Sequence, residues 1–157
     1  MYVAAGNVYS ETKPDAEFNA DQDVESYHVV LQKAHPKKVT ILPFSQVTTT
    51  NVTREWRETV LGAIPTRIMK AQNVFERISI DYKNTWALLD PIATGAVLDE
   101  TIIGDTKYSQ NSIILCGEQR GINTNNFTTA EEANVRVINQ IIEEKYQNLL
   151  ISIFSAE

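Results

Sequence analysis

The sequence predicts a layered α/β domain, in which helices flank a sheet that contains parallel strands. Three features carry this prediction. Residues 21–34 show apolar positions at helical spacings of 3, 4 and 3. The short β-branched stretch Val39–Phe44 follows at once and is typical of a buried strand. Further helical stripes lie later in the chain, so helices and strands alternate.

The amino-terminal elements follow from local signals. Met1–Gly6 is typical of the end of a buried strand that runs into a loop. Asp21 or Asp23 is the predicted N-cap of the first long helix. A second helix is expected over 53–61, closed by Gly62. A third begins near Pro65. Its regular apolar stripe predicts a face packed on the core and contains Ile64, Ile68, Ala71, Phe75 and Ile78.

The carboxyl-terminal elements are predicted in the same way. Asp90 followed by Pro91 is a typical helix start, with the aspartate as N-cap. A strand is expected over Tyr108–Cys116, with Cys116 as a small buried residue. From Thr128 we expect one long helix whose apolar stripe contains Val135, Ile138, Ile142, Leu149 and Ile153.

Composition limits the classes of function. A chain of 157 residues is long enough for one domain with its own core. The formal charge of −6 and the pI near 5.0 argue against a nucleic-acid partner, because such domains show basic patches. No apolar run approaches the roughly 20 residues needed to span a bilayer, so no membrane partner is expected. The sequence does not decide between a cytoplasmic and a secreted location.

The polar loop from Gly6 to Asn19 is the strongest candidate for a binding site. If the end of this loop is extended, Glu17 and Asn19 lie on the same side of the chain, because side chains alternate there. A carboxylate beside a carboxamide can bind vicinal hydroxyl groups, as on a sugar. The alternative is a surface loop whose polar residues serve only its own turns.

The motifs in and after this loop resemble a known family. Gly6-Asn7, Ala16-Glu17-Phe18-Asn19 and the helix start Asp23–Ser26 resemble the ribose-binding segment of the inosine–uridine nucleoside hydrolases. Matches continue in the family's order at Val39–Pro43, Leu89-Asp90-Pro91 and Gly117–Gly121. The resemblance implies a Rossmann-like layered sheet with flanking helices. It covers only the carboxyl-terminal half of the family domain, and the family's loop of the form Asp-x-Asp-x-x-x-Asp-Asp is absent from the sequence. We therefore expect residues 1–157 to form a single partial nucleoside hydrolase domain.

The same resemblance implies roles for particular residues. Asn7, Glu17, Phe18 and Asn19 would bind the nucleoside, mainly its ribose, and Asp90 would be the calcium ligand that this half supplies. Tyr82 and Trp86 are candidate stacking surfaces for a nucleobase. Trp86 could equally anchor its loop to the core.

The resemblance also limits catalysis. Many members have a histidine before the metal-binding aspartate that protonates the departing base. This chain has Leu89 there, so that acid is excluded, while a purine-preferring mode based on aromatic stacking stays open. The catalytic base would belong to the missing aspartate loop, so no catalytic residue is predicted here.

The expected reaction of the full-length enzyme is hydrolysis of a ribonucleoside to ribose and base, in a homo-oligomer. Departure of the base would give an oxocarbenium-like transition state. This chain alone is expected to be inactive. Two alternatives remain: a degenerate hydrolase half that binds nucleosides or sugars or serves assembly without catalysis, or an unrelated α/β domain with chance matches.

Overall fold

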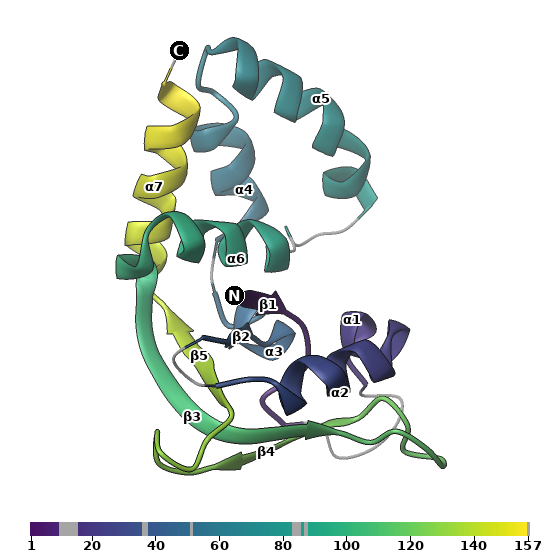
Figure 1. Ribbon diagram of the computed structural model, residues 1–157. Coiled ribbons are helices and arrows are strands. Elements are labelled where there is room, and N and C mark those ends of the chain that lie inside the picture. The colour runs from purple at the N-terminus through teal and green to yellow at the C-terminus, as the bar shows by residue number, and fades with distance from the viewer. Residues whose placement is uncertain (10–15, 36–37, 51, 83–85, 87, 157) are drawn as a thin grey trace.

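The computed structural model describes residues 1–9, 16–35, 38–50, 52–82, 86 and 88–156, with side chains left out at 81 and 82 (Figure 1). In this part of the chain five strands form one mixed sheet, in the order β1-β2-β5-β3-β4. Strands β1, β2 and β5 are parallel, and β3 pairs antiparallel with both β5 and β4. The strands are β1 Tyr2–Ala4, β2 Thr40–Leu42, β3 Ile103–Ile113, β4 Asn123–Phe127 and β5 Val135–Ile141.

Helices cover both faces of the sheet (Figure 1). Alternate strand residues point to opposite faces, so Ile41 and Val137 enter one core while Leu42 and Ile138 enter the other. The first core packs under α1 and α2, and the second packs under α6 and α7. The helices are α1 Phe18–Gln22, α2 Val24–Gln32, α3 Phe44–Val47, α4 Arg54–Trp56, a π-helical turn η1 Arg57–Leu61, α5 Arg67–Tyr82, α6 Leu89–Leu98, a 3-10 turn η2 Glu100–Ile102 and α7 Glu143–Ser155. This is the predicted layered α/β architecture.

Local signals located the amino-terminal elements correctly. Asp23 is the N-cap of α2 and accepts from the backbone N–H of Ser26 at 2.9 Å. Thr53 caps α4 through the N–H of Trp56, and Gly62 ends η1. The predicted strands at the amino terminus and after residue 38 are β1 and β2. Side chains that satisfy free N–H groups at helix starts are strong short-range signals.

The prediction of one long helix from Thr128 was wrong. Residues Val135–Ile141 form strand β5, and helix α7 begins only at Glu143. The strand is rich in β-branched residues, which fit a pleated surface, and it fills the position between β2 and β3. The prediction of a buried Cys116 was also wrong: β3 ends at Ile113, and the thiol is exposed beyond it.

The apolar stripe of α5 does not pack on the core as predicted. Ile68, Phe75 and Ile78 are 55%, 78% and 77% exposed. The inward face instead combines buried Met69 with Asn73 and Glu76, which hold the side chain of Arg57. A buried guanidinium needs polar partners, and this requirement decides which face of the helix turns inward.

Replacing Phe75 with serine should therefore leave the free energy of unfolding within about 0.5 kcal/mol, as for most surface substitutions. A phenylalanine in the core would cost about 3–5 kcal/mol on truncation. Urea unfolding followed by circular dichroism measures the difference. Ile80→Val on the buried side of α5 is the matched control, with an expected loss of about 1 kcal/mol. A loss above that of Ile80→Val would place Phe75 in the core.

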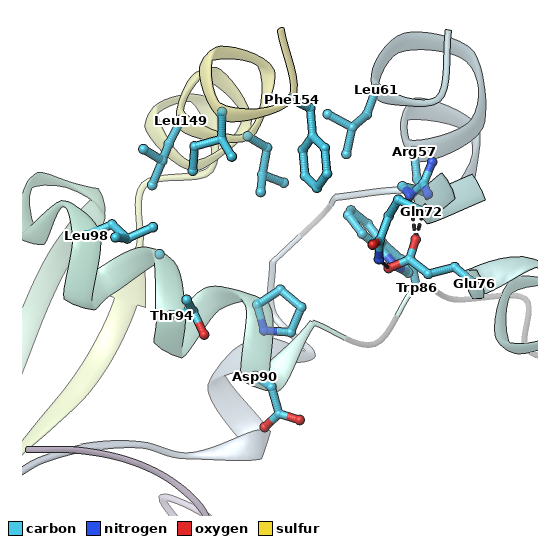
Figure 2. Close-up of a pocket in the computed structure, with 14 residues that line it drawn as sticks. Arg57, Leu61, Gln72, Glu76, Trp86, Asp90, Thr94, Leu98, Leu149 and Phe154 are labelled. Atoms are coloured by element: carbon cyan, nitrogen blue, oxygen red, sulfur yellow. Dashed lines mark hydrogen bonds and ion pairs between the residues drawn. The ribbon is translucent and has the colours of Figure 1, made fainter. Parts of the chain in front are cut away.

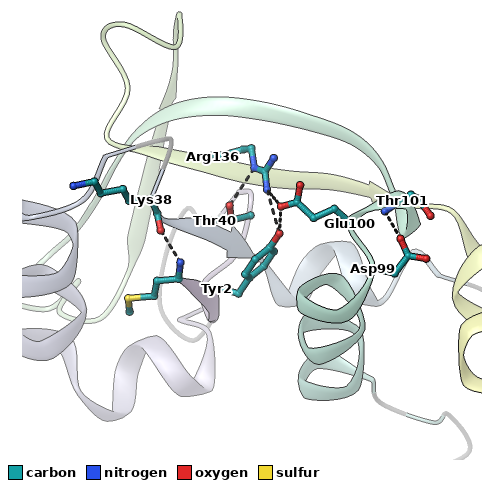
Figure 3. Close-up of polar contacts among 8 residues, drawn as sticks. Tyr2, Lys38, Thr40, Asp99, Glu100, Thr101 and Arg136 are labelled. Carbon is teal, nitrogen blue, oxygen red and sulfur yellow. Dashed lines mark hydrogen bonds and ion pairs between the residues drawn. The ribbon is translucent and has the colours of Figure 1, made fainter. Parts of the chain in front are cut away.

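A polar cluster joins the parallel strands to η2 (Figure 3). Arg136 on β5 donates to Glu100 at 2.8 Å and to the hydroxyl of Thr40 on β2 at 3.1 Å. The hydroxyl of Tyr2 on β1 also donates to the Glu100 carboxylate. The donated hydrogen bond from Tyr2 and then that from Arg136 lower the pKa of Glu100 below its ordinary value. The cluster ties β1, an edge strand of only three residues, to its neighbours.

We expect Glu100→Gln to flatten the acid side of the stability profile. The pKa of Glu100 is lower in the folded than in the unfolded chain. Its stabilisation is therefore present above the unfolded pKa and is lost as the pH falls through the folded pKa. Because the carboxylate is largely exposed, the effect is about 1 kcal/mol at most. Unfolding at a series of pH values measures it; equal acid slopes for the two proteins would contradict the assignment.

Candidate functional site

The candidate site lies where the parallel strands end. Residues 5–9 follow β1, and α3 follows β2 at the same edge of the sheet. The two segments are joined, because Phe44 N–H donates to the Gly6 carbonyl at 2.8 Å and Val8 N–H donates to the Ser45 hydroxyl at 2.9 Å. The Asn7 side-chain oxygen accepts from Ser45 N–H at 3.2 Å. The carboxyl ends of parallel strands are the usual place for ligands in open α/β sheets.

Glu17 is the N-cap of α1 and is only 6% exposed. Its carboxylate accepts from the backbone N–H groups of Gly6 at 2.8 Å, Asn19 at 3.1 Å and Ala20 at 3.1 Å. The prediction that an extended chain aligns Glu17 with Asn19 was wrong, because α1 begins at Phe18. Glu17 instead joins the loop after β1 to the start of α1. A carboxylate has about four acceptor positions, so one remains on Oε1.

Asn19 and Phe18 lie at the surface of the first turn of α1. The Asn19 amide nitrogen donates to the Ala4 carbonyl at the end of β1 at 2.9 Å, and its side chain is exposed. Phe18 is 71% exposed. The structure thus brings Asn7, Glu17 and Asn19 together around the end of β1.

Three residues that hold this loop were not found from the sequence. Asn123 and Asn125 on β4 bind the backbone of Asn7, and Tyr27 on α2 lies against Gly6. Burial raises the pKa of the Tyr27 hydroxyl, so it is a neutral donor near neutral pH. It donates to Asn111 on β3 at 3.0 Å. Asn123 and Asn125 lie 116 and 118 residues from Asn7, and Asn111 lies 84 residues from Tyr27, so only the fold could show these hydrogen bonds.

Asp90 lies in the first turn of α6, which packs against β1 and α3. The prediction that Asp90 caps this helix was wrong, because the N-cap is Leu88. Leu89, which stands where the resemblance expects a histidine, is the first residue of the helix. The Asp90 carboxylate is exposed and points away from the apolar residues of the neighbouring cavity (Figure 2).

The described residues do not make a metal site by themselves. Among them no group of three or more His, Cys, Asp or Glu side chains could hold an ion. Calcium requires 6–8 oxygen ligands, according to its general coordination chemistry. Asp90 alone therefore does not fit a calcium site, and any complete ligand set must draw on other residues.

Trp86 lies beside a cavity of about 380 Å³ between α5, α6, α7 and η1 (Figure 2). Arg57 lies over its ring, with Cζ 5.4 Å from the ring centroid, and Trp86 also packs against the core. These contacts favour the anchoring role, while stacking on a nucleobase stays a prediction. The side chain of Tyr82, the second aromatic candidate, lies outside the described residues. The apolar lining includes Leu61, Leu98, Leu149, Leu150, Ile153 and Phe154.

Fold and loop geometry together define an α/β protein with an ordered polar loop at the carboxyl ends of its parallel strands. The sequence matches the inosine-uridine preferring nucleoside hydrolase family over residues 1–148. The chain belongs to this family, whose members hydrolyse nucleosides. A search of curated proteins gave no significant match.

Solved structures show the same fold. An inosine-guanosine nucleoside hydrolase superposes with a TM-score of 0.79 at 21% identity, over 97% of this chain and 51% of that one. A plant nucleoside hydrolase, PpNRh1, gives 0.71 at 17% identity, over 98% and 52%. A purine-preferring ribonucleoside hydrolase from Gardnerella vaginalis gives 0.68 at 18% identity, over 99% and 49%. The chain therefore spans about half the length of these relatives. Within the described part of the chain, the helices are too short or too polar to cross a membrane.

Proposed function

We propose that this chain supplies the ribose-binding part of a ribonucleoside hydrolase and acts within a full-length enzyme. The reaction adds water across the bond between C1′ of ribose and the base nitrogen. That bond breaks, the hydroxyl goes to C1′, and the base leaves with a proton. The observation that supports this most is the family match, which coincides with the grouping of Asn7, Glu17 and Asn19 at the strand ends.

The chemistry of these groups suits ribose hydroxyls. The remaining acceptor position of Glu17 can accept a hydrogen bond from one ribose hydroxyl, and the Asn19 and Asn7 amides can both donate and accept. Phe18 would shield the sugar from water on the outer side. Holding the sugar in one orientation lowers the barrier to bond cleavage, because the entropy of alignment is lost on binding.

Other parts of the reaction need groups that this half does not provide. We propose that Asp90 contributes one ligand to a metal whose remaining ligands come from elsewhere in the full-length protein. Leu89 cannot donate a proton, so the departing base must be stabilised in another way. Stacking of a purine on the ring of Trp86 is one such way. We infer that the full-length protein is a homo-oligomer and that residues 1–157 alone are a partial, inactive domain.

The first test is titration of the isotope-labelled chain with ribose at millimolar concentrations, followed by NMR. We expect saturating shifts at the amides of Asn7, Glu17 and Asn19, and weaker shifts with 2-deoxyribose, which lacks one of the vicinal hydroxyls. No response at these amides would overturn the proposed sugar site.

A second measurement tests the inactivity of the chain. Inosine with calcium and the purified chain should give no hydrolysis above the blank, and clear turnover would overturn this expectation. The alternative function is a sugar-binding or assembly protein without catalysis. It predicts sugar binding without any gain in affinity when calcium is added to the full-length protein.

A further inference from the structure

Two asparagines of β4 hold the backbone of the ribose-binding loop. We propose that Asn123 and Asn125 are positioning residues, which fix the backbone of Asn7 so that its side chain faces the sugar in one orientation. This inference rests on the proposed function for its effect on ribose, but the backbone contacts can be tested without any ligand.

Asn123 makes two hydrogen bonds with one residue. Its Oδ1 accepts from the N–H of Asn7 at 2.8 Å, and its Nδ2 donates to the carbonyl of Asn7 at 2.8 Å. These are the two bonds that a neighbouring antiparallel strand makes with one residue. The side chain of Asn123 is 2% exposed, so water does not compete for these groups. The amide thus extends β-like pairing beyond the end of β1.

Asn125 binds the same segment two residues further along β4. Its Nδ2 donates to the carbonyl of Asn7 at 3.0 Å and to that of Val8 at 3.1 Å. Residues two apart on a strand share one face, so both asparagines point toward the loop. Asn126, which follows Asn125 on β4, is exposed on the other face of the strand.

The orientation of the Asn125 amide is set by its neighbours. Its Oδ1 accepts from the hydroxyl of Ser109 at 2.9 Å and from Asn111 Nδ2 at 2.8 Å. A flipped amide would face two donors with its own N–H groups and two carbonyls with its oxygen. Asn111 is in turn held by two residues. The Tyr27 hydroxyl donates to its side-chain oxygen, and the side-chain amide of Asn134 accepts from its backbone N–H and donates to its backbone carbonyl. A chain of buried and half-buried polar groups therefore runs from α2 through strands β3 and β4 to the loop.

Such a network could also serve only to stabilise the fold. The test must therefore measure the affinity for ribose separately from the stability of the folded chain. A positioning role predicts that sugar affinity falls even in molecules that stay folded, because binding groups must keep their geometry within about 0.5 Å. A role in folding alone predicts a lower unfolding temperature with unchanged affinity of the folded molecules.

The test is Asn125→Asp in the full chain, with Asn126→Asp as the matched control. The first change keeps the shape but replaces both donors with a carboxylate that faces two carbonyls. The second makes the same change one residue away on the exposed side. Three quantities are measured: hydrogen exchange of the Asn7 amide, NMR affinity for ribose, and the unfolding temperature.

We expect Asn125→Asp to speed exchange of the Asn7 amide and weaken ribose binding about tenfold, the effect of one lost hydrogen bond with a buried partner left unpaired. Asn126→Asp should change neither. Unchanged exchange and affinity in folded Asn125→Asp would overturn the proposal. If the unsubstituted chain does not bind ribose, the proposed function fails, and hydrogen exchange alone decides whether the two asparagines order the loop. If Asn125→Asp does not fold, Asn123→Asp is measured in the same way.

Discussion

Replacing Glu76 with alanine is expected to lower the free energy of unfolding by about 3–5 kcal/mol, because it leaves a buried cation without its anion. Arg57 is 1% exposed, and its Nε donates to Glu76 Oε2 at 2.8 Å. Its Nη2 lies 2.6 Å from the same oxygen, in an ion pair whose geometry is not that of a hydrogen bond. Among the residues that the structure describes, Asn73 and the ring of Trp86 are further partners of the guanidinium. Neither of them carries a negative charge.

Urea unfolding measures this loss, and Glu58→Ala is the matched control. Glu58 pairs with Arg54 on the exposed side of the same helical segment, so its removal should cost less than about 1 kcal/mol. The double variant Arg57→Met, Glu76→Leu should recover most of the loss, because apolar residues of similar size can replace a buried ion pair. Equal losses of unfolding free energy for Glu76→Ala and Glu58→Ala would show that the charge of Arg57 does not depend on Glu76 for its stabilisation.

Replacing Gly6 with alanine should lower the free energy of unfolding by about 2–3 kcal/mol and disturb the loop proposed to bind ribose. Gly6 has φ of +78°, which an L-residue adopts at a cost of about 1–2 kcal/mol. An added Cβ would also lie 3.1 Å from Asn123 Cγ and 3.1 Å from the Tyr27 hydroxyl. Both neighbours are buried and hydrogen-bonded, so they cannot move away without breaking hydrogen bonds. This crowding adds about 1 kcal/mol or more to the loss of unfolding free energy.

The variant Gly117→Ala separates the cost of the positive φ angle from the cost of crowding around the added Cβ. Gly117 has φ of +80°, but no heavy atom lies within 4 Å of its added Cβ. It should show the backbone cost alone and leave ribose binding unchanged. Unfolding and the ribose titration are measured for both variants. If Gly6→Ala cost no more than Gly117→Ala and bound ribose normally, the close approach of Asn123 and Tyr27 would have no energetic weight.

The sequence by itself determined the features that depend on neighbouring residues. Asp23 was one of two aspartates predicted to cap α2, because such a side chain bonds a backbone N–H group only three residues away. The strand after residue 38 follows from equally local chemistry. The resemblance of short motifs was enough to indicate the family, which the match over residues 1–148 then established.

Only the tertiary structure decided which faces are buried and which side chains meet. The stripe of Phe75 and Ile78 has helical spacing, but the need to neutralise Arg57 turns the opposite, polar side of α5 inward. Residues 135–141 became a strand because β2 and β3 pair with them. Asn123 meets Asn7 across 116 residues of sequence. Burial and hydrogen-bond pairing depend on residues that are distant in the sequence, whereas a sequence pattern depends only on neighbouring residues. For this reason helix caps and short strands could be predicted, but the buried faces and the long-range contacts could not.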